Sequence, residues 1–432
     1  MGYPCSRRQF FHRVSAVTAT ALLGKSAHAS VPSHRISECL NVAIIGVGAM
    51  GRAHLDYLSG HAGVHLSAVA DPDGQRRQSA RECAAQRRLR VPAYADYREM
   101  LHEHHELDAV FIATPDHWHA RAALDCMQAG KDVYGEKPLA RTIAEGRRIV
   151  EAARRHGRIF QLGTQQRSDY PHFRHVCELI RNGRIGEVRR VVCFFGPNPY
   201  ADAVPAEAPP DYLDWSRYLG PVPWRPYNRL VHPANFRYFR AFAGGLITDW
   251  GVHLFDIAQW ALEKDGTSPR RIEAEGEFAP GNAYDVPRRM RVQYDYDDVT
   301  LEWRQGMGGD VEAGQRYGTK FYGAEGEIFV NRAGYWARCA DGRPLDEHLG
   351  AHAIRLDTAL NHREDFLASV RTRRAPLCGA EIGHRASALA HLGNLALDAG
   401  MPLEYDPIRE AFLTDRGTRA ANREGIPDSA CG

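Results

Sequence analysis

A lysine, Lys137, is the first residue of this chain whose type suggests chemistry. It stands in a Gly-Glu-Lys-Pro segment and is one of only five lysines in a chain with fifty arginines. An ammonium group can be desolvated and can release its proton, whereas a guanidinium stays charged. Lysine at this point, after an apolar run and before Pro138, therefore indicates a catalytic group. The alternative is that one lysine in five lies at a strand end by chance.

Asp249 and His253 form a second candidate pair, in an Asp-Trp-Gly-Val-His segment. Their i, i+4 spacing places both side chains on one face of a helix that we predict to continue to Leu262. An imidazole beside a carboxylate is a general base tuned near neutral pH, and Asp256 is placed to orient the ring. The alternative is a helix-capping aspartate followed by an ordinary buried histidine.

A Gly-x-Gly-x-x-Gly motif at residues 46–51 follows the apolar run 42–45 and opens a predicted helix. In this context the glycines let the backbone approach a pyrophosphate at a helix N-terminus. Asp71 lies twenty residues past the last glycine, where its carboxylate can accept hydrogen bonds from an adenosine ribose. This favours NAD over NADP, although Arg76 and Arg77 could instead meet a 2′-phosphate. The alternative is a glycine turn selected only for helix–sheet packing.

Two further groups of polar residues follow predicted strands. His117 and His119 have the spacing of a metal pair in a loop, but they lack a third clustered ligand. We therefore expect no metal and place them near the nicotinamide. Gln166 and Arg167 follow the strand that ends at residue 162, at the edge of the sheet where a ligand cleft should open.

An aromatic-rich segment at residues 215–237 is the last candidate site. Trp224 and Tyr227 within it could present flat apolar faces and hydrogen-bond donors to a sugar ring. The alternative is a set of surface loops packed by their own aromatic side chains.

The elements that must position these residues alternate between strand and helix in the first part of the chain. Such alternation predicts a parallel, doubly wound sheet, the Rossmann architecture. The predicted strands are 42–45, 66–70, 109–113, 132–134 and 159–162, with a helix at 142–156.

Beyond residue 187 the pattern changes to hairpins. A strand at 188–195 and alternating runs at 289–304 and 321–335 predict an open, largely antiparallel sheet with one solvated face, accompanied by helices at 361–370 and 382–399. A length of 432 residues also favours two domains. The fold class is therefore α/β, with a Rossmann domain followed by an α/β domain. The predicted boundaries are 1–29 for a leader, 40–162 for the Rossmann domain, 163–405 for the second domain and 406–432 for a tail.

The leader has the three parts of a twin-arginine signal peptide. Arg7 and Arg8 are followed by an apolar run at 14–23 and a small-residue cleavage site at 27–29. We therefore expect export to the periplasm; the alternative is a disordered tail that contains arginine. The apolar run is too short to span a bilayer and no later segment is long enough, so no membrane insertion is expected.

Composition excludes other partners. The net charge is +2, and without a basic stripe interleaved with aromatics the chain is not expected to bind nucleic acid. Nine dispersed cysteines show no zinc-like spacing, and the sequence leaves any disulfide pairing open.

Four segments together resemble the glucose–fructose oxidoreductase/inositol dehydrogenase/rhizopine catabolism (Gfo/Idh/MocA) family. They are the glycine motif, Thr114–His119, Glu136-Lys137-Pro138 and the Asp-x-x-x-His at 249–253. The resemblance covers about residues 40–405, and it implies a homo-oligomer, a dimer or a tetramer. It implies Lys137, Asp249 and His253 as the catalytic set. The implied cofactor contacts are Gly46, Gly48, Met50, Gly51, Asp71, Thr114, Pro115, His119, Glu136 and Lys137. The expected substrate contacts are Gln166, Arg167, Trp224, Tyr227 and His253.

The expected function is an NAD(P)-dependent oxidoreductase that acts on a CH–OH group of a sugar, polyol or glycoside, with NAD preferred. Because the periplasm offers no nicotinamide pool, the cofactor should be held tightly and recycled within each turnover. One alternative is a redox-neutral glycosidase or lyase that works through a transient keto sugar. The other is a sugar-binding protein without catalysis.

Overall fold

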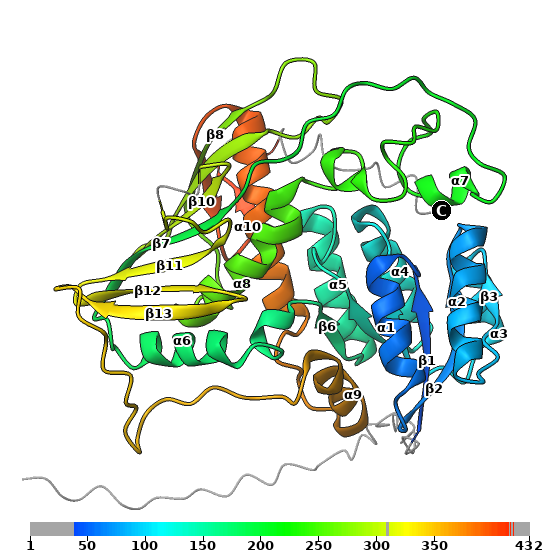
Figure 1. The fold of residues 1–432 in the computed structure, drawn as a ribbon, viewed down its shortest axis with the longest axis horizontal. Helices are drawn as coiled ribbons and strands as arrows, with labels where there is room; N and C mark the ends of the chain where they lie inside the picture. The colour runs from blue at the N-terminus through cyan, green and yellow to red at the C-terminus, as the bar shows by residue number, and fades with distance from the viewer. Residues whose placement is uncertain (1–38, 308–310, 414, 416–417, 419–432) are drawn as a thin grey trace, which may run out of the picture. The chain divides into compact units, whose positions relative to one another are not determined.

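The computed structural model describes residues 39–307, 311–413, 415 and 418. The predicted leader at 1–29 lies outside these ranges, as does most of the predicted tail. Within them the chain forms two β-sheets with helices packed on them (Figure 1). No helix among the described residues is long and apolar enough to cross a membrane.

The first sheet is the predicted Rossmann sheet. Its strands run parallel in the order β3-β2-β1-β4-β5-β6. They are β1 (Leu40–Ile45), β2 (Val64–Ala70), β3 (Ala93–Tyr94), β4 (Ala109–Ile112), β5 (Asp132–Gly135) and β6 (Phe160–Leu162). The strands are short and almost wholly apolar because helices cover both faces of a parallel sheet. The carboxyl ends of β1, β4 and β5 therefore open at one edge, where the candidate residues follow them.

Helices connect these strands and cover both faces. They are α1 (Ala49–Ser59), α2 (Gly74–Gln86), α3 (Tyr97–Glu103), α4 (His119–Gln128) and α5 (Ile143–His156). Helix α5 begins at a capping box in which Thr142 and Glu145 satisfy each other's backbone N–H groups. Helix α1, by contrast, has Gly48 as its N-cap and no side chain that caps it. Its first N–H groups therefore remain available to an anion.

The second sheet has nine strands in the order β13-β12-β11-β7-β10-β9-β8-β14-β15. Only β7 and β10 pair in parallel; the other neighbours are antiparallel. The strands are β7 (Val188–Phe195), β8 (Arg271–Glu277), β9 (Arg289–Asp295), β10 (Thr300–Gln305), β11 (Gly318–Gly323), β12 (Gly326–Asn331), β13 (Gly334–Cys339), β14 (Leu403–Asp406) and β15 (Ala411–Phe412). The predicted fold class is confirmed, although β8 was not predicted and β15 lies within the range expected as a tail.

The helices of the second part are α6 (Pro171–Arg181), α7 (Trp215–Leu219), α8 (Val252–Ala261), α9 (His362–Thr372) and α10 (Ala380–Ala399). One face of the nine-stranded sheet packs on α8 and α10, with Phe255 of α8 lying 5.6 Å from the rings of both Tyr294 and Trp303. The open sheet, its covering helices and the Rossmann part share one continuous core.

Helix α10 also anchors the segment that follows Lys137. Ser387 Oγ accepts a hydrogen bond from the backbone N–H of Leu139 at 2.9 Å, and His391 Nε2 lies 3.0 Å from the carbonyl oxygen of Ala140. The two pairs are 248 and 251 residues apart in sequence. The position of the lysine loop therefore depends on the second part of the chain.

Candidate active site

Lys137 follows β5 and contacts a residue of the second part. Its Nζ donates a hydrogen bond to the carbonyl oxygen of Asp249 at 2.8 Å and a second one to Oδ1 of the same residue. Arg237 Nε donates to that Oδ1 at 3.2 Å. Burial alone would raise the pKa of Asp249, but the two cations hold it below its ordinary value. Asp249 is thus an anion clamped between two cations from separate segments.

Asp249 lies in a π-helical turn, Ile247–Gly251, that directly precedes α8. The sequence predicted one regular helix here. A π turn inserts one residue into a helical ladder and often accompanies a functional site. It places Asp249 on Lys137, while the ring of His253 lies edge-on to Trp250 at 6.0 Å. The structure thus brings all three predicted catalytic residues to one place, with no hydrogen bond between Asp249 and His253.

His253 is buried, and no described residue hydrogen-bonds its ring; Nδ1 in particular is fully enclosed without a partner. Burial lowers the pKa of His253 well below its ordinary value, and the nearby charge of Lys137 and Arg332 lowers it further. The imidazole is therefore neutral at pH 7 and can accept a proton. The expectation that Asp256 orients this ring is wrong, because Arg167 Nε lies 2.9 Å from both carboxylate oxygens of Asp256.

Asp116 is a fourth charged residue of this site, and it was not predicted. Burial raises the pKa of its carboxyl, against the opposing charges of His119, Arg237 and Lys137. It follows Thr114 and Pro115 directly in the sequence, in the segment after β4. Its position just past the carboxyl end of a central strand of the sheet was the signal available in the sequence.

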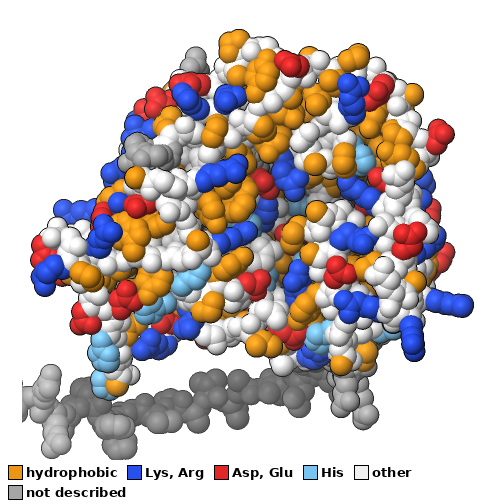
Figure 2. Space-filling model, viewed as in Figure 1, with side chains coloured by type: hydrophobic (Ala, Val, Ile, Leu, Met, Phe, Trp, Pro, Cys, Tyr) orange, Lys and Arg blue, Asp and Glu red, His pale blue; other side chains and the backbone are white. Residues whose placement is uncertain are grey.

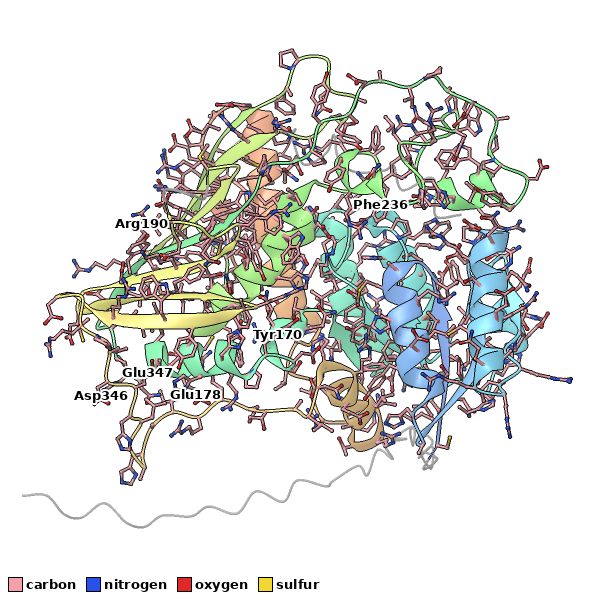
Figure 3. All side chains as sticks on the ribbon, viewed as in Figure 1. Tyr170, Glu178, Arg190, Phe236, Asp346 and Glu347 are labelled. Atoms are coloured by element: carbon pink, nitrogen blue, oxygen red, sulfur yellow. The ribbon has the colours of Figure 1, made fainter. Side chains whose placement is uncertain are left out.

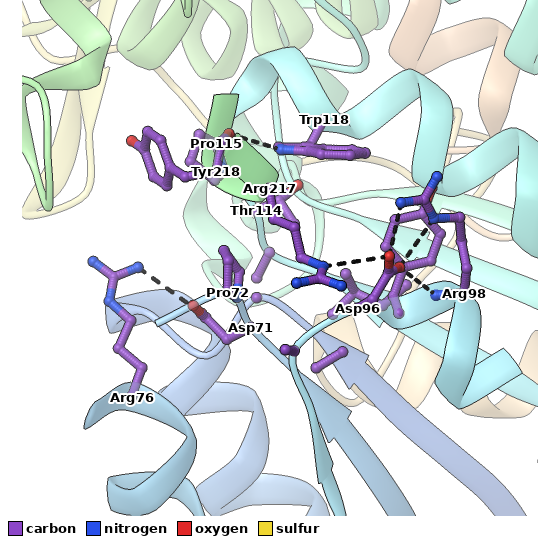
Figure 4. A pocket seen from close by; sticks show the side chains of 16 residues that line it. Asp71, Pro72, Arg76, Asp96, Arg98, Thr114, Pro115, Trp118, Arg217 and Tyr218 are labelled. Atoms are coloured by element: carbon purple, nitrogen blue, oxygen red, sulfur yellow. Dashed lines mark hydrogen bonds and ion pairs between the residues drawn. The ribbon is translucent and has the colours of Figure 1, made fainter. Parts of the chain in front are cut away.

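A pocket lies at the carboxyl ends of β1, β2 and β4 (Figure 4). It encloses about 570 Å³, a volume that includes space open to solvent. Asp71 lines this pocket. Its Oδ2 accepts a hydrogen bond from the backbone N–H of Val47, and its Oδ1 accepts one from the backbone N–H of Asp73, both at 2.9 Å. Arg76 Nη1 lies 3.9 Å from the same carboxylate. Lining residues include Gly46, Asp71, Thr114, Pro115, Trp118 and Tyr218.

The three glycines have different reasons to be glycine. Gly46 has a positive φ of 86°, and a Cβ there would lie 2.7 Å from the backbone of Ala113; a Cβ on Gly51 would lie 1.9 Å from the carbonyl oxygen of Gly46. Packing therefore explains these two. A Cβ on Gly48 would meet only the Arg76 side chain, at 3.3 Å, so internal packing does not require this glycine. A ligand that approaches the uncapped start of α1 closely would require a glycine at position 48. The glycine loop and this helix start therefore fit the pyrophosphate of a dinucleotide. Met50, in the first turn of α1, is 38% exposed.

His119 and Glu136 hold loops in place. The two ring nitrogens of His119 lie 2.6 Å from the carbonyl oxygen of Pro138 and 2.9 Å from that of Thr114, so the ring ties the β4 loop to the lysine loop. The Glu136 carboxylate points into the protein, where His54 Nε2 lies 2.9 Å from its Oε1. The Glu136 side chain is thus engaged inside the protein, and its contact with the cofactor stays a prediction.

Arg167 does not contact the site, in contrast to the prediction. Its side chain is 2% exposed. Asp256 and Asp265 saturate its guanidinium, because Nη2 donates to Asp265 at 2.6 Å in addition to the bonds of Nε to Asp256. Gln166 is fully buried, and both polar atoms of its amide have no partner among the described residues.

Trp224 and Tyr227 are not brought to the catalytic residues either. Trp224 is 76% exposed. Tyr227 is buried in an aromatic cluster of the 213–243 segment, with its ring 5.1 Å from that of Trp215. The alternative interpretation, loops packed by their own aromatics, describes this segment better. His117 belongs to the same cluster: it lies 5.0 Å from the Phe242 ring, and burial lowers its pKa to about 3.

Two family models match the chain. Residues 40–164 match an oxidoreductase family with an NAD-binding Rossmann fold, and residues 200–424 match the C-terminal alpha/beta domain of the same oxidoreductase family. The chain therefore belongs to the Gfo/Idh/MocA family and is an oxidoreductase. The resemblance in the sequence motifs is confirmed at the level of the family.

Individual relatives agree with this assignment. The chain is 24% identical over 384 residues to myo-inositol 2-dehydrogenase of Thermotoga maritima, covering 85% of this chain and 99% of that protein. A shorter match, 34% identical over 170 residues, is to a glycosyl hydrolase family 109 protein of Shewanella, covering 34% of this chain and 37% of that protein. The solved structure of aldose–aldose oxidoreductase from Caulobacter crescentus, complexed with glycerol, has a TM-score of 0.62 at 18% identity, covering 85% and 99% of the two chains. This last likeness shows a shared fold.

Proposed function

We propose that this protein oxidises a CH–OH group of a sugar, polyol or glycoside with a tightly held NAD. The observation that carries the proposal is the Lys137–Asp249–Arg237 clamp beside the neutral, unpartnered His253. Oxidation of a CH–OH group removes a proton from the oxygen and a hydride from the carbon. The oxygen therefore needs a base that accepts the proton and a hydrogen-bond donor that stabilises its developing negative charge. His253 and Lys137 supply them.

The chain's own residues divide the work as follows. The nicotinamide, when bound, accepts the hydride. His253 accepts the hydroxyl proton, because its imidazole is neutral at working pH. An ammonium has three N–H donors, and Asp249 takes two of those of Lys137. The third donor is left for the substrate oxygen, where it stabilises the developing negative charge.

The surroundings of Asp71 support NAD over NADP. Asp71 and Asp73 present two buried carboxylates at the end of β2, which would repel a 2′-phosphate. We expect Asp71→Asn to weaken NAD binding about 10- to 100-fold, since hydrogen bonds to a charged acceptor contribute about 1.5–3 kcal/mol. Titration of stripped protein with NAD and NADP measures both affinities. Arg76→Gln is the matched control and should keep the preference for NAD; a preference for NADP in the parent protein would contradict this assignment.

We further propose export through the twin-arginine route and a cofactor that is regenerated within each cycle. The name of the structural relative, aldose–aldose oxidoreductase, fits a reaction in which one sugar is oxidised and another is reduced. Nicotinamide absorbance that persists after dialysis of the purified protein is the expected result.

A redox-neutral glycosidase is the second candidate, favoured by the 34% match to a glycosyl hydrolase family 109 protein. Product analysis separates the two. Protein purified with its cofactor is incubated with free sugars and with glycosides, and the products are identified by mass spectrometry. An oxidised sugar together with a reduced one supports the oxidoreductase, whereas a released aglycone without net redox change supports the glycosidase. No product in either set would leave a sugar-binding protein.

A further inference from the structure

Arg332 lies in the turn between β12 and β13, and its guanidinium stacks on two aromatic rings. Its Cζ lies 4.7 Å from the ring centre of Trp250 and 5.7 Å from that of Tyr170. Tyr170 directly precedes α6, at the end of that helix toward which the β12–β13 turn points (Figure 3). The arginine is thus held between two elements by cation–π contacts.

This guanidinium has no anionic partner. No described residue forms a hydrogen bond or an ion pair with Arg332, and its Nε is enclosed without an acceptor. Arg167, a buried arginine of this part, is by contrast saturated by two aspartates. The Arg332 side chain as a whole is half-buried, so its guanidinium is open to an acceptor that a ligand supplies, which the enclosed Nε lacks within the protein.

The turn that carries Arg332 is held in a defined conformation. Asn331 is buried, and its Nδ2 donates to Gln315 Oε1 at 2.8 Å while its Oδ1 accepts from the N–H of Ala333 at 2.8 Å. Trp250 is fixed in turn, because it stacks on Phe195 at 4.7 Å. The position of the guanidinium is therefore set before any ligand arrives.

Arg332 faces the catalytic site. Trp250, on which it stacks, is the residue next to Asp249, and the same indole lies 6.0 Å from the ring of His253. The positive charge of Arg332 also acts on His253. Of the three cations here, Lys137 and Arg237 share Asp249 as their counter-ion, whereas Arg332 has none. In the space-filling view, basic side chains gather around the central hollow of this face (Figure 2).

We propose that the substrate is a sugar acid whose carboxylate binds Arg332. This inference rests on the proposed sugar oxidation and names its substrate class. A guanidinium fork matches the two oxygens of a carboxylate in a bidentate pair. Arg332 has no counter-ion of its own, and one guanidinium matches a monoanion, which favours a carboxylate over a phosphate ester.

The test compares matched substrates on the cofactor-loaded protein. The probes are glucuronate, galacturonate and mannuronate, the corresponding hexoses, and the hexose 6-phosphates. We expect kcat/KM for at least one uronate to exceed that for its hexose and its hexose phosphate by about 10- to 100-fold, the value of a charge-assisted pair. In Arg332→Met the ratio of uronate to hexose should fall by a similar factor, and Arg332→Lys should recover part of it.

Arg338→Met is the matched control. Arg338 is an exposed residue of β13 whose guanidinium also stacks on an aromatic ring, that of Trp336 at 4.5 Å, and its replacement should leave the ratio unchanged. Melting temperatures of all variants check folding. A parent protein that prefers hexoses or phosphates overturns the proposal, and so does an equal loss on acid and neutral sugars in Arg332→Met, which would show a purely structural arginine.

Calorimetry separates this inference from the proposed function. Binding of a uronate to the parent protein that is lost in Arg332→Met supports the carboxylate site even if no sugar is oxidised, and in that case only the proposed function fails. Oxidation of hexoses without any measurable uronate binding would overturn the carboxylate site alone.

Discussion

Turnover of the Lys137→Arg variant is expected to fall by about 10²- to 10⁴-fold, the usual contribution of a positioned proton donor. The charge is kept, so any loss reports the geometry of the ammonium. Lys137 Nζ contacts two oxygens of Asp249 and points its remaining N–H away from them. A planar guanidinium cannot reproduce this arrangement next to Arg237, which already contacts the same carboxylate.

Steady-state kinetics with the substrate found in the product screen measures this effect, with retained nicotinamide quantified in each preparation. Lys264→Arg is the matched control, because Lys264 forms an exposed ion pair with Asp298 at 2.8 Å; it should keep parental turnover. A Lys137→Arg enzyme with parental kcat and normal cofactor content would exclude the proposed role of the lysine.

The second large effect is expected for His253→Gln, with kcat reduced by about 10²- to 10⁴-fold through loss of the general base. The parent enzyme should also show a characteristic pH profile. Burial lowers the pKa of His253 well below its ordinary value of 6.5. Only the neutral form accepts a proton, so activity stays high as the pH falls through 6.5 and is lost only when the pH approaches the lowered pKa.

The measurement is log kcat/KM against pH, which reports the free enzyme. The acid limb should lie below pH 6.5 in the parent protein and disappear from the residual activity of His253→Gln. His65→Gln changes an exposed histidine and should alter neither rate nor profile. An acid limb that survives in His253→Gln would assign the base to another group, and Asp116, whose pKa is raised by burial, would be the next residue to replace.

The fold was predictable because its signals are local. Short apolar runs separated by helical patterns determine a parallel sheet wherever helices can cover both of its faces, and β7 was predicted to the residue at 188–195. The loop that joins β1 to α1 was also predictable from the sequence, because a side chain at Gly46 or Gly51 would collide with neighbouring backbone atoms. The π turn at Asp249 was not, because no spacing in the sequence distinguishes it from a regular helix.

The roles of individual side chains were predictable only where they do not depend on partners from distant segments. Lys137, Asp249 and His253 were found from residue type and spacing alone, and the structure brings them together. Arg167 was misassigned because a sequence shows an arginine at a sheet edge but not Asp256 and Asp265, which surround it. Composition does not say whether an aromatic ring faces a cleft, solvent or its own loop; in the structure Trp224 faces solvent and Tyr227 faces its own aromatic cluster.

The sequence by itself thus determined the family and the two-sheet architecture, and it predicted Lys137, Asp249 and His253 as the catalytic residues. Only the tertiary structure decided which groups surround each charged side chain. Arg237 donates a hydrogen bond to Asp249, the charge of Lys137 acts on Asp116, and Arg332 stacks on Trp250 without a counter-ion. The physical reason is that electrostatic and hydrogen-bond energies depend on distances between atoms. Packing sets those distances between segments that are 12 to more than 100 residues apart.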